Sequence, residues 1–185
     1  LVPTEITMAT TAVLGTGLLG TGFAQRMLSL GHTVRVWNRT AARCTPLADE
    51  GAILAQTPAD AVRGADYVHL VLTADSAVDT VIGQLRSDLA PSTPILDHST
   101  NLPAAVAARF ARLRTTGVRY LHAPVFMGPS NSREGTGLML IAGPTEEVDA
   151  LGPYLSTLTG TVQNLGDRPD KAAAVKLIGN SVLLM

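Results

Sequence analysis

Short runs of β-branched and aliphatic residues alternate along this chain with longer stretches whose apolar residues recur at helical spacing. The short runs predict strands, at Thr11–Leu14, Thr33–Trp37, Tyr67–Leu72, Ile95–Asp97, Arg119–Leu121, Leu138–Ala142 and Thr161–Leu165. The longer stretches predict helices, at Leu18–Leu30, Thr40–Glu50, Asp75–Leu89, Pro103–Leu113, Glu146–Leu158 and Lys171–Met185. Regular alternation of strand and helix favours a doubly wound α/β fold with a mostly parallel sheet.

Composition narrows the class of protein. The chain has 185 residues, of which 46% are hydrophobic and 16% charged, so it can bury a sizeable core. Its formal net charge of −1 offers no basic field for nucleic acid. Apolar runs are far shorter than the roughly 18 residues of a membrane span, and a single cysteine, Cys44, excludes an internal disulfide framework. These features predict a soluble protein of the cytoplasm.

Three glycines follow the first predicted strand at the spacing of a dinucleotide-binding turn. The run is Gly15-Thr16-Gly17-Leu18-Leu19-Gly20, directly before a predicted helix. In such a turn the glycines permit a tight bend, a bare backbone against pyrophosphate and close helix–strand packing. The helix N-terminus adds free N–H groups and partial positive charge. We therefore predict a Rossmann-like fold with a dinucleotide on this loop; the alternative is a tight turn without a ligand.

The end of the second predicted strand bears on the choice of cofactor. An acidic residue there binds the ribose hydroxyls of NAD, but this chain has Asn38, followed by Arg39, Thr40 and Arg43. An amide, a hydroxyl and two guanidinium groups suit a dianionic 2′-phosphate. The expected cofactor is NADP, with NADPH preferred over NADH. Alternatively, the two arginines are surface charges.

Only two of the fourteen cationic side chains are lysines, Lys171 and Lys176. Lys176 lies in an almost uncharged stretch that predicts a helix. A partly desolvated lysine can release its proton, whereas arginine cannot. Lys176 is therefore a candidate general acid/base, with Asn180 one turn further on the same face. A lysine whose stem covers apolar surface is the alternative, and Lys171 is expected to be solvated.

In combination, these motifs resemble the N-terminal part of the β-hydroxyacid dehydrogenases, the family of 3-hydroxyisobutyrate dehydrogenase and 6-phosphogluconate dehydrogenase. The resemblance covers roughly residues 11–185. The segments that carry it, besides the glycine turn, are Gly31–Thr40, Leu72–Asp75, Asp97–Thr100, His122–Gly128 with Arg133–Thr136, and Lys176 with Asn180.

The resemblance implies roles for particular residues. Lys176 would exchange a proton with the substrate hydroxyl while hydride passes to or from nicotinamide, and Asn180 would help to position the substrate. Leu72, Thr73 and Thr100 would lie beside the cofactor. Phe126, Met127 and Gly128 would bind a small hydroxy acid or its aldehyde or keto form, whose carboxylate would meet backbone N–H groups after Pro124.

Two departures from the family pattern leave alternatives open, and one of them is that Asp170 and Ala172 stand where the family commonly has glycines. Phe126 and Met127 replace a serine and a glycine that the family has there, which points to a less polar substrate or another binding mode. An imine-reductase-like enzyme of the same fold and a non-catalytic NADP-binding module are therefore the other hypotheses. His98 and His122 lack a third ligand at suitable spacing, so we predict no metal site.

The resemblance also predicts the organisation of the chain. Residues 1–7 would be an extension outside the fold, residues 8–167 the dinucleotide-binding domain, and residues 168–185 the start of a long interdomain helix. In the family an all-helical C-terminal domain follows, which closes the substrate pocket and forms a homodimer. The chain as it stands would lack that domain and turn over poorly.

Overall fold

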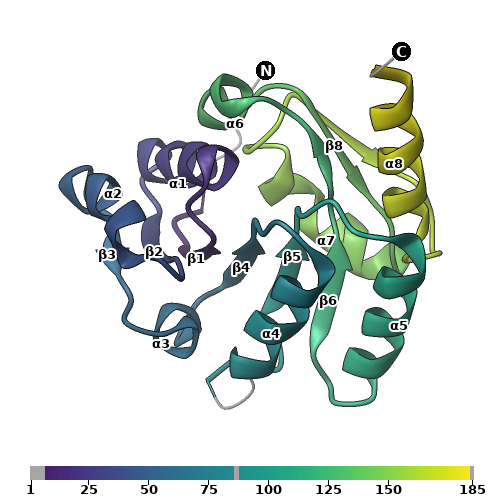
Figure 1. Ribbon diagram of the computed structural model, residues 1–185, viewed down its shortest axis with the longest axis horizontal. Coiled ribbons are helices and arrows are strands. Elements are labelled where there is room, and N and C mark those ends of the chain that lie inside the picture. The colour runs from purple at the N-terminus through teal and green to yellow at the C-terminus, as the bar shows by residue number, and fades with distance from the viewer. Residues whose placement is uncertain (1–6, 86–87, 184–185) are drawn as a thin grey trace.

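The computed structural model describes residues 7–85 and 88–183, which form an α/β sandwich (Figure 1). The main sheet has six strands in the order β3-β2-β1-β4-β5-β6, and every neighbouring pair is parallel. The strands are β1 (Thr10–Leu14), β2 (Thr33–Trp37), β3 (Ile53–Leu54), β4 (Tyr67–Leu70), β5 (Pro94–Asp97) and β6 (Arg119–His122). The predicted doubly wound Rossmann-like fold is confirmed.

The strand order reverses beside β1, and this determines where a ligand can bind. The chain moves outward from β1 through β2 to β3, and then returns to place β4 on the other side of β1. Thr11 accordingly pairs with Val34 on one side and with Tyr67 on the other. Loops that leave β1 and β4 in opposite directions open a crevice at the carboxyl ends of the strands.

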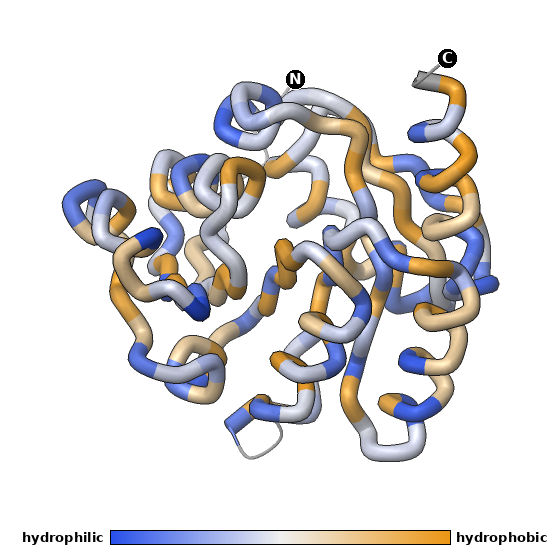
Figure 2. The backbone as a smooth tube through the Cα atoms, viewed as in Figure 1, coloured by the Kyte–Doolittle hydropathy of each residue, from blue (hydrophilic) through white to orange (hydrophobic). Residues whose placement is uncertain are grey.

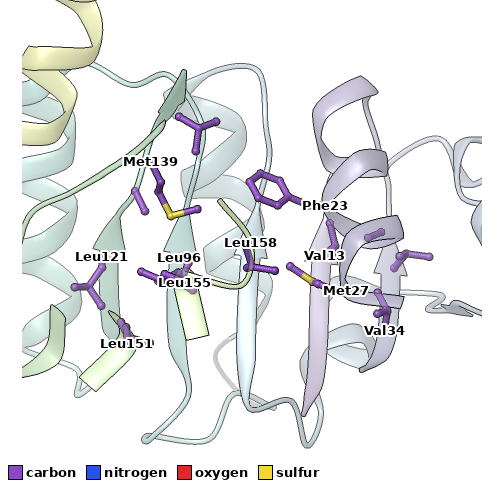
Figure 3. Packing of buried hydrophobic residues seen from close by; sticks show 14 of the residues in the cluster. Val13, Phe23, Met27, Val34, Leu96, Leu121, Met139, Leu151, Leu155 and Leu158 are labelled. Atoms are coloured by element: carbon purple, nitrogen blue, oxygen red, sulfur yellow. The ribbon is translucent and has the colours of Figure 1, made fainter. Parts of the chain in front are cut away.

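Helices cover both faces of this sheet. One face carries α1 (Leu18–Ser29), α2 (Thr45–Asp49) and α7 (Thr145–Leu155), whereas α3 (Pro58–Val62), α4 (Asp75–Leu85) and α5 (Pro103–Arg114) pack on the other. Successive strand residues point to opposite faces: Val13 joins the cluster under α1 and α7, while Ala12 and Leu14 join the cluster under α3, α4 and α5. Figure 3 shows the first cluster, in which Phe23 and Met27 of α1 pack toward Leu158.

A second sheet, of three strands, follows the main one. The sequence patterns did not predict that these strands form a separate sheet. It consists of β7 (Val125–Phe126), β8 (Leu138–Ile141) and β9 (Thr161–Asn164), with β7 antiparallel to β8 and β8 parallel to β9. A single bridge between His122 and Ala142 connects it to β6. The short helix α6 (Pro129–Glu134) lies between β7 and β8 and packs against α1, because Gly22 leaves room for the hydroxyl of Ser132.

The last helix, α8 (Lys171–Leu183), stands beside α5 and β8 (Figure 1). Ala172 and Ala173 at its start are buried, but Val175, Ile178 and Val182 are 36%, 65% and 65% exposed. Figure 2 shows hydrophobic residues continuing along this helix to its far end. Among the described residues, none of the helices combines the length and the hydropathy that a membrane crossing requires.

Several predicted elements differ in detail. The predicted helix Thr40–Glu50 is wrong: a 3-10 turn, η1 (Ala41–Arg43), precedes the short α2, because Pro46 can occupy only a first helical turn. The strand β3 and the helices α3 and α6 were missed because each is too short to show its periodic pattern clearly. Parts of the predicted segments at residues 1–7, 75–89 and 171–185 lie outside the described residues.

Candidate functional site

The glycine loop between β1 and α1 adopts a conformation that only glycines can form. Gly15 has φ +105°, and a Cβ atom there would lie 2.2 Å from the carbonyl oxygen of Val71. A Cβ atom at Gly20 would lie 1.9 Å from the carbonyl oxygen of Gly15. Both distances are far below van der Waals contact, so these two glycines allow β1, β4 and α1 to approach closely.

Gly17 serves the loop in a different way. A Cβ atom at Gly17 would meet no described atom within 4 Å, so its backbone faces open space. Gly17 is also the N-cap of α1 and makes no side-chain capping bond, which leaves N–H groups of the first turn available to an anion. An open cleft of about 530 Å³ lies here, and its lining includes Leu18, Arg43 and Arg133. The loop therefore fits a pyrophosphate group on both shape and charge.

Asn38 braces this loop from the end of β2. Its Oδ1 accepts a hydrogen bond of 3.2 Å from the backbone N–H of Thr16, and its Nδ2 donates one of 3.1 Å to the carbonyl oxygen of Thr40. The Thr16 hydroxyl lies 3.4 Å from the sulfur of Cys44, which is buried in the core. Both polar groups of Asn38 are thus engaged within the protein, and Cys44 has a packing role.

Arg39, Thr40 and Arg43 extend from the same region into solvent. All three residues are exposed, and no hydrogen bond or ion pair of their side chains is found within the described part of the chain. Other arginines of this protein pair with carboxylates, as Arg63 does with Asp88. Arg39, after β2, and Arg43, in η1, therefore remain open to an external anion.

A side-chain hydrogen bond joins the loops that follow β4 and β5. The hydroxyl of Ser99 accepts the backbone N–H of Leu72 at 2.9 Å. Thr73 and Thr100, the next residue in each loop, are exposed at the same edge of the sheet. Ser99 was not among the predicted site residues, although its position directly after a buried strand is a signal that could have identified it.

Asp97, at the end of β5, holds the second of these loops in place. Its carboxylate accepts hydrogen bonds from the Ser99 N–H (3.0 Å), the Asn101 Nδ2 (2.6 Å) and the Tyr120 hydroxyl (2.7 Å). Arg109 lies 3.8 Å from it and also pairs with Asp75 and Asp79 of α4. Asp97 and Arg109 are both buried, and this charge network had no signature in the sequence.

Lys176 lies on the face of α8 that meets the second sheet. Its Nζ is 4.0 Å from the centroid of the Phe126 ring, and no carboxylate partner is present among the described residues. Partial burial lowers the pKa of Lys176, because water solvates its ammonium group less well there. Asn180, one turn further, is half-buried, while Lys171 is exposed as expected.

The predicted substrate segment is only partly open. Phe126 contacts α8, whereas Met127 packs against the first hydrophobic cluster. The N–H of Gly128 already donates to Oδ1 of Asn131 at 2.9 Å. The structure therefore brings Phe126 to Lys176, but it turns Met127 toward Gly137 and engages the Gly128 amide internally.

His69 of β4 and His98, directly after β5, form a buried polar chain with Tyr154. Nδ1 of His98 donates to the carbonyl oxygen of Ala123 at 2.7 Å, and its Nε2 lies 2.9 Å from Nδ1 of His69. Nε2 of His69 in turn lies 2.7 Å from the Tyr154 hydroxyl. Burial lowers the pKa of His98 to about 4 and that of His69 well below its ordinary value. Within residues 7–85 and 88–183, no group of three or more potential ligands could hold a metal ion.

Comparison with known proteins identifies the family of this chain. Residues 10–166 match the model of the NAD binding domain of 6-phosphogluconate dehydrogenase. The chain belongs to this family. It is thus an NAD(P)-binding domain, and the resemblance to the dehydrogenases that the sequence motifs indicated is confirmed.

Relatives within the family carry different names. The chain is 37% identical over 133 residues to cytokine-like nuclear factor N-PAC of Xenopus tropicalis, covering 70% of this chain and 25% of that protein. It is 30% identical over 176 residues to 3-sulfolactaldehyde reductase of Escherichia coli, covering 94% and 59%. An imine reductase of Streptomyces aurantiacus superposes with a TM-score of 0.88 at 27% identity, covering 95% of this chain and 62% of the other. The chain therefore spans less than two thirds of each of these relatives.

Proposed function

We propose that this protein is an NADP-dependent oxidoreductase that transfers hydride between nicotinamide and the carbon of a carbonyl or alcohol group. Lys176 is the acid/base of the reaction, and Asn180 positions the substrate. The observation that carries the proposal is the setting of Lys176: a half-buried lysine without a carboxylate partner in the described structure, in a chain that is similar to 3-sulfolactaldehyde reductase.

The proposed cofactor site rests on two sets of residues. Backbone groups of the loop Gly15, Thr16, Gly17, Leu18, Leu19 and Gly20 would receive the pyrophosphate, supported by the open space at Gly17. Arg39, Thr40 and Arg43 would hold a 2′-phosphate, supported by their exposure and the lack of internal partners among the described residues. Asn38 would act indirectly, by holding Thr16 and Thr40.

The residues beside the nicotinamide would come from the two loops that the Ser99 hydroxyl joins. Leu72, Thr73 and Thr100 are proposed there because the Ser99–Leu72 hydrogen bond keeps their loops together at the crevice beside β1. NADPH, when bound, supplies the hydride. The protein would contribute a fixed orientation of the nicotinamide ring, which lowers the barrier to transfer.

Lys176 would handle the proton. In reduction, its ammonium donates a proton to the carbonyl oxygen as negative charge develops there, and in oxidation the neutral amine accepts the hydroxyl proton. A lowered pKa brings both forms closer to physiological pH, which favours either role. Arginine at this position would retain the charge but could not exchange the proton.

The test compares Lys176→Met and Lys176→Arg with the unaltered protein, in a panel of aldehydes and keto acids with NADPH. We expect both variants to lose kcat by about 10²- to 10⁴-fold, the usual contribution of a general acid, while the Kd for NADPH stays within about twofold of the original because Lys176 is remote from the pyrophosphate loop. In alcohol oxidation, the activity of the unaltered protein should rise with pH as Lys176 loses its proton, and the variants should lack this rise. Undiminished reduction by Lys176→Met would refute the lysine mechanism.

A second candidate is an imine reductase. It is favoured by the similarity to the Streptomyces aurantiacus enzyme and by the apolar Phe126 at the proposed substrate segment. Imines reduced with NADPH at a rate that Lys176→Met leaves unchanged would support it. A third candidate, a non-catalytic NADP-binding module, predicts NADPH binding without turnover of any aldehyde, keto acid or imine.

The organisation of the whole protein is also a proposal. Residues 8–167 would be the dinucleotide-binding domain, and residues 168–185 would begin an interdomain helix that leads to a helical domain. We further propose that the whole protein is a homodimer in the cytoplasm and that it binds neither nucleic acid nor membranes. The exposed apolar residues Val175, Ile178 and Val182 on α8 support further packing on this helix.

A further inference from the structure

We infer that Phe126 is the residue that selects the substrate, and that it selects carbonyl compounds whose side chain is apolar rather than carboxylate-bearing. The inference rests on the proposed function, because it concerns the substrate that Lys176 would protonate. It depends on three features of the structure: the packing of the Phe126 ring against α8, the contact of the ring with Lys176, and the small number of hydrogen-bond donors around the ring.

The Phe126 ring packs closely against Gly179 of α8. A Cβ atom at Gly179 would lie 2.4 Å from Cζ and 2.9 Å from Cε1 of the ring, so only a glycine allows the ring this position. Behind the ring, Leu138 and Leu165 pack with it on a small buried cluster that includes Leu140. Phe126 itself is only partly buried. Its remaining surface is therefore a rigid apolar wall.

The same ring covers one side of Lys176. Its centroid lies 4.0 Å from Nζ, which is cation–π distance. Lys176 and Gly179 are three residues apart on α8, and both contact Phe126. A group that receives a proton from Lys176 must therefore approach from a side of the ammonium that the ring leaves uncovered.

Donors for a carboxylate are scarce around this wall. The side chain of Phe126 has no hydroxyl or amide, and the N–H of Gly128 is already bonded to Asn131. Met127 turns away, since a Cβ atom at Gly137 would lie 2.9 Å from its Cγ. The ammonium of Lys176 and the amide of Asn180 are the donors beside the ring, and in the proposed reaction both serve the carbonyl oxygen. A carboxylate placed against Phe126 would therefore lose hydration with little gain in hydrogen bonds, whereas an alkyl or aryl group would gain contact.

Two aldehydes of nearly the same shape test the inference. Succinic semialdehyde ends in a carboxylate, and 4-methylpentanal carries an isopropyl group in its place. We expect kcat/KM with NADPH to favour 4-methylpentanal by at least about tenfold, the range that one hydrophobic group contributes to discrimination. Phe126→Ser, which adds a hydroxyl and opens the wall, should reduce this preference by about tenfold or reverse it. Phe126→Leu, which remains apolar, should retain it.

Phe110→Ser is the matched control, because the Phe110 ring also lies beside a cation, Arg114 at 5.6 Å, but in the C-terminal half of α5 and outside the second sheet that carries Phe126. This variant should leave the preference between the two aldehydes unchanged.

The same two aldehydes are also titrated by calorimetry into protein saturated with NADP⁺, in which neither can be reduced. Preference is then measured even without turnover.

The outcomes separate the two proposals. Tighter binding or faster reduction of succinic semialdehyde, an unaltered preference in Phe126→Ser, or binding of neither aldehyde overturns the inference about Phe126. Selective binding of 4-methylpentanal without any reduction that depends on Lys176 would overturn the proposed function and leave the selectivity of Phe126 standing.

Discussion

Asn38 and Thr16, 22 residues apart, are joined by a hydrogen bond of 3.2 Å from the backbone N–H of Thr16 to Oδ1 of Asn38. This bond ties the end of β2 to the glycine loop. The other half of the Asn38 amide donates to the carbonyl oxygen of Thr40, so one side chain fixes the glycine loop and the start of the proposed 2′-phosphate site together.

Replacing Asn38 with leucine, which has the same shape but no polar atoms, should loosen both sites. We expect the Kd for NADPH to rise by roughly 5- to 30-fold, because each lost hydrogen bond contributes about 1 kcal/mol. Isothermal titration calorimetry measures this. Asn164→Leu is the control, since Asn164 likewise accepts a backbone N–H, that of Gly166, but at the remote end of β9. Equal affinities for the Asn38 and Asn164 variants would contradict the bracing role.

Gly17 and Gly20 should respond differently to alanine. At Gly17 the added methyl group meets open space in the protein, so Gly17→Ala should fold normally and lose NADPH affinity by about tenfold or more, because the methyl group displaces the pyrophosphate. Gly20→Ala should lose stability as well, since its Cβ would collide with the Gly15 carbonyl.

Urea unfolding and cofactor titration together separate these two effects. Gly83→Ala, at a helical position on α4 where a Cβ atom would meet no atom of the described residues within 4 Å, is the control and should be more stable by about 0.5–1 kcal/mol with unchanged affinity. Normal NADPH binding by Gly17→Ala would show that the loop does not hold the pyrophosphate.

Arg39 and Arg43 should decide the choice between the two nicotinamide cofactors. The double variant Arg39→Ala/Arg43→Ala should raise the Kd for NADPH by about tenfold or more and change that for NADH little, because only NADPH has the 2′-phosphate that forms charge-assisted bonds. The difference should shrink as salt is raised. Arg168→Ala, an exposed arginine that pairs with its neighbour Asp170, is the control. Parallel losses for both cofactors would reject the assignment.

His98 should make the fold sensitive to acid. Its pKa is lowered by burial to about 4, whereas an unfolded histidine has a pKa of about 6.5. The unfolded state therefore binds more protons between these values, and the free energy of unfolding falls as pH drops through this window. Over the pH interval that separates the two pKa values, the free energy of unfolding should fall by on the order of 3 kcal/mol.

Urea midpoints at pH 7, 5.5 and 4 measure this loss, and an NMR titration of the imidazole signals reports the pKa of His98 directly. His98→Gln removes the titrating group, so the decline between about pH 6.5 and pH 4 should become shallower, whatever the variant's stability at pH 7. A His98 with an ordinary histidine pKa in the folded protein would disprove the prediction.

The larger elements were accessible from the sequence because their signals are local. Period-two and helical spacing of apolar residues lies within each segment, so most strands, the longer helices and the parallel sheet could be predicted. The glycine loop is also local, since its conformation depends on three glycines within six residues. Short elements such as β3, α3 and α6 lack a clear periodic pattern and were not predicted.

Contacts between distant segments carry no comparable signal. Ser99 and Leu72 are 27 residues apart, and the bond between them depends on the alignment of β4 beside β5. Arg109 resembles any other helical arginine until tertiary packing buries it beside Asp97, Asp75 and Asp79. A glycine inside a helix, as at Gly179, was the one available hint of the close approach by Phe126.

By itself, the sequence determined the alternating α/β architecture and the glycine loop and indicated the candidate acid/base, because these follow from residue type and spacing along the chain. Only the tertiary structure decided that Phe126 covers Lys176, that Asn38 hydrogen-bonds the glycine loop, and that a second sheet carries the proposed substrate segment toward α8. The reason is that side-chain contacts between remote segments form only when the packing of whole elements brings those segments together.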